Sequence, residues 1–112
     1  MSEIALITQS MGGITVTVEK GKDVLMPRYD EDVLPAMAVM AINFLNAGCN
    51  DVRIPFSAND VVMGWSKSEI VSAIKRQFFL FQNGRQFAFV VERKGRTTQY
   101  ILTVRFKIEK GA

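Results

Sequence analysis

The sequence contains no histidine and only one cysteine, Cys49. Without histidine, the chain lacks the usual general base near neutral pH, the commonest metal ligand, and the group that activates a serine or cysteine nucleophile. A single cysteine cannot form an internal disulfide, and a zinc site built from four Cys and His ligands cannot be assembled. We therefore predict a protein that is not an enzyme and that carries neither a metal ion nor a cofactor.

Long apolar runs are also absent from the chain. No stretch reaches the roughly 18 residues of a membrane span. The first ten residues carry Glu3 and no basic group, which is unlike a secretory signal. Glycine patterns of the P-loop or dinucleotide-binding type are missing as well. We expect a cytoplasmic protein without a membrane partner, and the unpaired Cys49 fits a reducing compartment.

The composition that remains is that of an ordinary globular protein. Of 112 residues, 48% are hydrophobic and 22% are charged, values that exclude wholesale disorder. The length corresponds to one domain. Because no linker, repeat or low-complexity tract marks a boundary, we predict a single domain over residues 1–112.

Charge is distributed unevenly along the chain. Residues 1–52 carry three basic and seven acidic groups, a net charge of −4. Residues 53–112 carry eleven basic and four acidic groups, a net charge of +7. An acidic half joined to a basic half suggests that one face of the protein meets a polyanion.

The first half of the sequence predicts a hairpin and a helix. Two β-rich segments within residues 3–19 flank a Gly-Gly turn, which is typical of a β-hairpin. Residues 30–47 show apolar positions at helical spacing, with the acidic triplet Asp30–Asp32 at the start and Gly48 at the end. Three consecutive carboxylates diverge around a helix axis, so we interpret the triplet as a cap and not as a metal site.

The middle of the sequence predicts a strand and two helices in quick succession. Residues 52–56 are extended, and Pro55 restricts them to a sheet edge or a strand end. Two capping boxes, Ser57–Asp60 and Ser66–Glu69, predict helices over 58–63 and 66–82, separated by a glycine. A short helix, a glycine turn and a longer helix form a helix-turn-helix. The second helix has a polar, basic face made of Lys67, Ser68, Ser72, Lys75 and Arg76.

Residues 86–108 predict a second β-hairpin, because apolar side chains alternate on both sides of a glycine turn. Three cationic side chains, Arg93, Lys94 and Arg96, occupy its tip. Like charges repel one another there, and phosphate groups would relieve the repulsion.

In this order, residues 30–108 resemble the winged helix-turn-helix family. The resemblance implies an α+β fold with a three-helix core and a C-terminal hairpin wing, to which residues 1–29 add an N-terminal hairpin. It implies that the helix over 66–82 enters the major groove of DNA and that the wing contacts the adjacent backbone or minor groove. The DNA-binding residues implied in this way are Lys67, Ser68, Ser72, Lys75, Arg76, Arg93, Lys94 and Arg96.

We therefore expect a small, sequence-specific regulator of transcription that binds double-stranded DNA. One such module reads few base pairs, so a homodimer is expected, with helix 30–47 or the N-terminal hairpin as its interface.

Two alternatives remain open. The chain is alternatively a protein–protein interaction module, an adaptor or inhibitor, which uses an exposed apolar residue such as Phe79 or Leu80, or a free strand edge. A less favoured alternative is single-stranded nucleic-acid binding by aromatic residues of the sheet. The aromatic residues in question are Phe87, Phe89, Tyr100 and Phe106, whose alternation places them on inward-facing positions.

Overall fold

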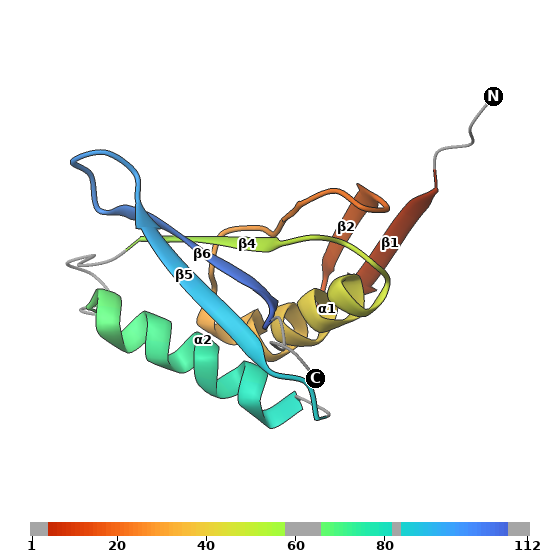
Figure 1. Cartoon of the computed structure of the whole chain (residues 1–112). Coiled ribbons are helices and arrows are strands. Elements are labelled where there is room, and N and C mark those ends of the chain that lie inside the picture. The colour runs from red at the N-terminus through yellow and green to blue at the C-terminus, as the bar shows by residue number, and fades with distance from the viewer. Residues whose placement is uncertain (1–4, 58–65, 82–83, 108–112) are drawn as a thin grey trace.

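The computed structural model describes residues 5–57, 66–81 and 84–107. These residues form an α+β fold with two sheets (Figure 1). The elements are β1 (Leu6–Met11), β2 (Ile14–Glu19), β3 (Val24–Leu25), a short 3₁₀ turn (Glu31–Val33), α1 (Leu34–Asn46), β4 (Val52–Ser57), α2 (Lys67–Phe81), β5 (Phe87–Arg93) and β6 (Gln99–Phe106). No helix in these parts of the chain is long and apolar enough to cross a membrane.

The larger sheet has four strands in the order β3-β4-β6-β5. β3 runs parallel to β4, while β6 runs antiparallel to both of its neighbours. The register pairs Ser57 of β4 with Gln99, and Arg93 of β5 with Tyr100. β6 is therefore an interior strand, and the hairpin turn after β5 continues directly from the sheet.

Both α-helices cover the same face of this sheet, as Figure 1 shows. The apolar positions of the strands alternate toward the helices, where Ile54, Phe56 and Leu102 are fully buried. Phe44 of α1 and Phe78 of α2 complete this core. On the other face no described element covers the strands, and Leu25 and Val90 are exposed there.

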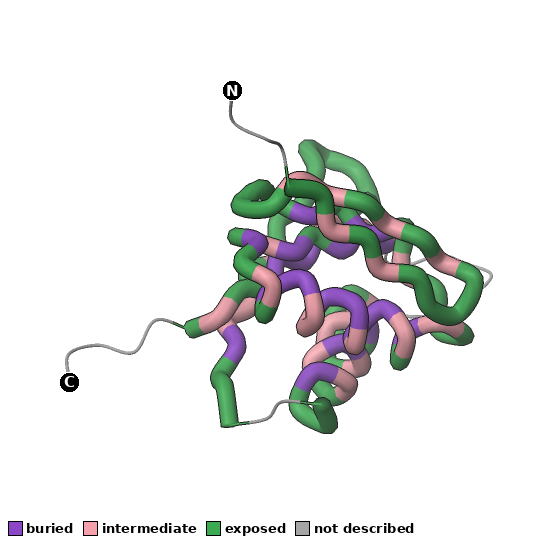
Figure 2. Tube along the Cα trace, turned by 90° about the vertical axis from the view of Figure 1, so that its right-hand side faces the viewer, coloured by how far each residue is buried: buried purple, intermediate pink, exposed green. Residues whose placement is uncertain are grey.

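The N-terminal hairpin packs against α1 through β1 (Figure 2). Its turn lies so close to the helix that a Cβ on Gly12 would stand 2.9 Å from the Cβ of Ala36. Farther along, Asn43 Nδ2 donates to Gln9 Oε1 at 3.2 Å. Because α1 contacts the hairpin, strand β4 and helix α2, apolar residues on most of its sides are buried.

Three local signals in the sequence are confirmed. Asp30 caps the 3₁₀ turn that leads into α1, accepting a hydrogen bond from the Asp32 amide. Ser66 Oγ accepts from the Glu69 amide at 3.2 Å and so caps α2. Gly48, with φ of +100°, ends α1 in the left-handed region that glycine adopts without strain.

Pro55 lies in β4 between two other strands, although proline within a sheet is normally confined to edge strands. However, β3 is two residues long and pairs only with Val52 and Arg53. The carbonyl of Pro55 points to that side and accepts from the Tyr29 amide at 2.7 Å. The nitrogen of Pro55 faces the same side, past the end of β3, where no ladder hydrogen bond requires an N–H. Pro55 is therefore at a local edge.

The expected winged-helix core is wrong. The described residues contain two α-helices that lie on a four-stranded mixed sheet, and the strand over 52–57 and the C-terminal hairpin form the centre and one side of that sheet. Sequence patterns predicted most of the helices and strands but not how the strands pair. In the structure β6 pairs with both β4 and β5 and so joins them in one sheet. The predicted helix over 58–63, and the glycine that follows it, lie outside the described residues.

Candidate nucleic-acid interface

The turn between β5 and β6 holds cationic side chains at the far end of the hairpin. The backbone closes the turn, because the Lys94 amide donates to the Gln99 carbonyl at 2.8 Å. Arg93 Nε donates to the Thr97 carbonyl at 3.0 Å. Lys94 and Arg96 are exposed. The turn is thus internally braced and presents its charges to solvent.

Lys67, the first residue of α2, reaches the same end of the molecule. Its Nζ lies 5.3 Å from the centre of the Tyr100 ring, close enough for a cation–π contact. Tyr100 pairs with Arg93 across the hairpin and stacks on Phe56, with ring centres 5.4 Å apart. Tyr100 therefore fixes the base of the hairpin beneath Lys67, and Figure 1 shows the start of α2 on the same side of the molecule as the turn.

Arg28 adds a cation that sequence reasoning missed. Its Nη2 donates to Ser57 Oγ at 2.7 Å, and Ser57 is the β4 residue that pairs with Gln99. This contact places Arg28 beside the hairpin on the face that the helices leave open. No motif singles out Arg28, because the contact depends on how β4 pairs with β6.

We call these five residues the cationic end: Arg28, Lys67, Arg93, Lys94 and Arg96. None of them forms an ion pair within the described residues. Glu92 is the acidic residue next to them in sequence. Elsewhere on the same sheet the pattern differs, since Arg53 and Arg105 each pair with a carboxylate. The pairs are Arg53 Nη2 with Asp23 Oδ2 at 3.1 Å and Arg105 Nε with Asp51 Oδ1 at 3.3 Å.

The remaining predicted DNA-binding residues of α2 are not brought together with the tip. Lys75 lies two turns along the helix, with Nζ 5.6 Å from the Phe89 ring on the β5 side. Arg76 lies on the opposite side, toward α1. Ser68 and Ser72 are exposed. The basic face expected of a recognition helix is therefore divided between two sides of α2.

Comparisons with known proteins give no information about the function of this arrangement. No protein-family model, curated protein or solved structure matches the chain. The resemblance to winged-helix proteins therefore has no support beyond the sequence pattern, and the function has to be inferred from the charges and geometry of the site.

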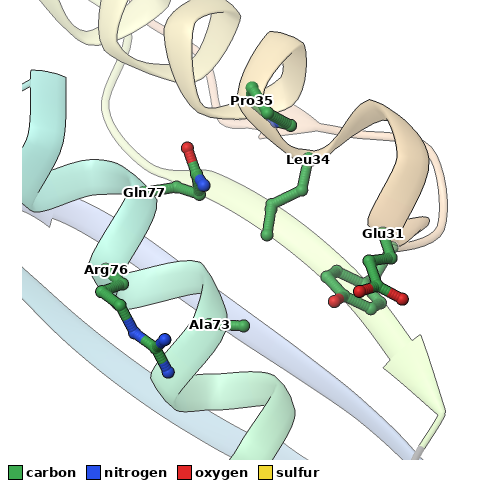
Figure 3. Close-up of a pocket in the computed structure, with 7 residues that line it drawn as sticks. Glu31, Leu34, Pro35, Ala73, Arg76 and Gln77 are labelled. Atoms are coloured by element: carbon green, nitrogen blue, oxygen red, sulfur yellow. The ribbon is translucent and has the colours of Figure 1, made fainter.

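A concave feature lies between the start of α1 and the middle of α2. It is a cleft of about 320 Å³ (Figure 3). Tyr29 lines it, and the Tyr29 hydroxyl is covered and has no hydrogen-bond partner among the described residues. Burial raises the pKa of Tyr29, and the nearby carboxylates of Glu31 and Asp30 raise it further. An unsatisfied buried hydroxyl costs roughly 1–3 kcal/mol of stability.

The described residues contain no metal-binding cluster and one buried cysteine. No cluster of three acidic or cysteine side chains that could hold a metal ion occurs there. Cys49 is buried, and its burial raises the pKa of the thiol. A buried thiol with a raised pKa is a poor nucleophile.

Proposed function

We propose that the chain is a non-enzymatic DNA-binding protein that contacts the phosphate backbone of a duplex with the cationic end. One observation carries the proposal: five cations from three separate segments lie at one end of the molecule without an ion pair among the described residues. Positive side chains that are held together, and that have no carboxylate partner, gain free energy when phosphates replace the released counterions.

The shape of the cationic end suits a duplex. The β5–β6 turn projects beyond the helices in Figure 1, so phosphates can reach Lys94 and Arg96 without a clash with α1 or α2. Lys67 and Arg28 stand behind the turn on the two faces of the sheet. Phosphate contacts of this kind position a protein on DNA and give affinity, while base contacts give sequence specificity. Sequence-specific regulation of transcription stays a prediction.

Binding of single strands by base stacking is less well supported. Phe87 is buried against α2, where its ring meets Phe78 edge-on. Lys67 and Lys75 lie over the rings of Tyr100 and Phe89. Bases need open aromatic faces on which to stack, and these rings face the helices. The observation favours backbone contact over stacking.

The direct test is a titration of fluorescently labelled duplex DNA with the full chain at several salt concentrations. Five phosphate contacts predict a slope of log affinity against log salt of about −4.5, or roughly a 500-fold loss of affinity between 50 and 200 mM salt. The triple variant Arg93→Ala/Lys94→Ala/Arg96→Ala should reduce the slope to about −1.8.

A matched control removes the same charge from elsewhere on the molecule. Lys22→Ala/Arg53→Ala/Arg105→Ala takes away three cations outside the cationic end, and it should leave the slope near that of the parent chain. Equal losses in both triple variants would show that net charge, and not the cationic end, governs binding. No binding at low salt would refute the proposal, and stronger binding to single strands than to duplex would replace it with the stacking alternative.

A further inference from the structure

The cleft between α1 and α2 is separate from the cationic end and has a different chemical character. Its floor is apolar, formed by Leu34, Pro35 and Ala73. Its volume of about 320 Å³ is at the small end of ligand pockets, which run from roughly 300 to 1,000 Å³. A molecule of the size of an amino acid fits such a space, whereas a nucleotide cofactor does not.

The two walls of the cleft carry opposite charges. Glu31, in the turn that leads into α1, lies on one wall, and Arg76 of α2 lies on the other, beside Gln77. Figure 3 shows Leu34 and Ala73 in the space between them. Both charged residues belong to the part of the chain that the structure describes, and they form no ion pair with each other. The carboxylate of Glu31 and the guanidinium of Arg76 therefore line the same cleft without an ion pair between them.

We propose that this cleft binds a free α-amino acid with an apolar side chain. The ligand ammonium group would pair with Glu31, the ligand carboxylate would pair with Arg76, and the apolar side chain would lie on Leu34 and Ala73. A simple anion would face repulsion from Glu31, and a simple cation would face repulsion from Arg76. A zwitterion meets an opposite charge on each wall, and a guanidinium is well suited to a carboxylate because of its planar fork of donors.

One polar neighbour strengthens this assignment. Gln77 adds an amide on the wall where the carboxylate is placed. A phosphate backbone would meet Glu31 and its acidic neighbours at this site, so the inference is independent of DNA binding.

The experiment measures thermal unfolding and calorimetric binding of the full chain with leucine and phenylalanine. Each amino acid should raise Tm in a saturable manner. For each ligand, two analogues lack one charge: 3-methylbutylamine and 4-methylpentanoate for leucine, and 2-phenylethylamine and 3-phenylpropanoate for phenylalanine. These analogues should produce no saturable shift, and neither should glutamate, whose second carboxylate would lie on the apolar floor.

Variants locate the site. Arg76→Gln and Glu31→Gln change exposed residues, and each should abolish the Tm shift while the unliganded chain stays folded. Lys75→Gln, the adjacent change on α2, should retain the full shift. The proposal fails if no apolar amino acid gives saturable binding, if the single-charge analogues bind equally well, or if binding persists in both Arg76→Gln and Glu31→Gln.

Discussion

The two ends of the four-stranded sheet carry the same kinds of basic residue in different electrostatic settings. At one end Arg53 and Arg105 are each paired with a carboxylate, and both arginines remain about half exposed. At the other end the cations of the hairpin tip have no such partner within the described residues. Exposed ion pairs contribute only about 0–1 kcal/mol to stability. The main consequence of pairing is therefore electrostatic. The carboxylates cancel the positive potential around Arg53 and Arg105, whereas the cationic end retains its positive potential.

The largest expected effect comes from reversing charge at the tip. Arg93→Glu/Lys94→Glu replaces two attractions to phosphate with two repulsions, so duplex affinity at 50 mM salt should fall on the order of 100-fold. Fluorescence anisotropy measures the loss, and urea unfolding should show that the variant stays folded, although it loses the hydrogen bond from Arg93 to the Thr97 carbonyl. The reversal Arg53→Glu/Arg105→Glu should weaken binding far less, because both arginines are already paired with carboxylates at the other end of the sheet. Comparable losses of duplex affinity in both double variants would show that the two ends of the sheet do not differ in DNA binding.

The second prediction removes the carboxylates from the paired end. Asp23→Asn/Asp51→Asn frees Arg53 and Arg105, so that this end acquires unpaired cations of its own. If the ion pairs are what prevent this end from binding phosphates, the slope of log affinity against log salt for a long duplex should steepen by up to about 2. Stability should fall by less than about 1 kcal/mol for each pair. An unchanged slope with unchanged affinity would show that shape, and not pairing, distinguishes the two ends.

Much of the fold could be predicted from local sequence patterns. Alternation indicated both hairpins, and the caps at Asp30 and Ser66 marked where the helical segments begin. The order of the strands could not be predicted, because β3 is only two residues long and its pairing with Val52 depends on the helix between them. The winged-helix interpretation failed at this step, because the hairpin of β5 and β6 can form either a separate wing or one half of a four-stranded sheet.

Only part of the candidate site could be predicted, because local patterns can be read from the sequence and tertiary contacts cannot. Arg93, Lys94 and Arg96 belong to one turn, so a local pattern was sufficient to group them. Lys67 and Arg28 join them only through tertiary contacts, with Tyr100 and Ser57 respectively. Helical spacing alone grouped Arg76 with the DNA-binding residues, whereas the packing of α2 against α1 turns Arg76 into the cleft.

A third, smaller effect tests whether Lys67 belongs to the cationic end. Lys67→Ala should reduce the salt slope by about 1 and weaken binding to all duplex sequences equally, which is the signature of a phosphate contact. Lys67→Arg keeps the charge over the Tyr100 ring and should bind nearly as well as the parent chain. A Lys67→Ala variant that loses affinity without a change in slope would indicate that Lys67 acts by holding the hairpin base.

The smallest effect is expected between the two ends, at Tyr29. Tyr29→Phe removes a covered hydroxyl that has no partner among the described residues, so the free energy of unfolding should rise by about 1 kcal/mol. The salt slope for duplex DNA should not change, because Tyr29 is not part of the cationic end. A loss of stability would mean that the hydroxyl is satisfied in solution.

The pH dependence of the same variant follows from the direction of the pKa shift. The pKa of Tyr29 is raised in the folded chain by burial and by the carboxylates of Glu31 and Asp30. Above about pH 10 the unfolded chain loses this proton while the folded chain retains it, so the parent protein should lose stability as pH rises through that range. Tyr29→Phe has no such proton to lose. Urea unfolding at pH 8 and pH 11 should therefore show a smaller fall for the variant, and an equal fall would mean that Tyr29 is as easily ionised in the folded chain as in the unfolded one.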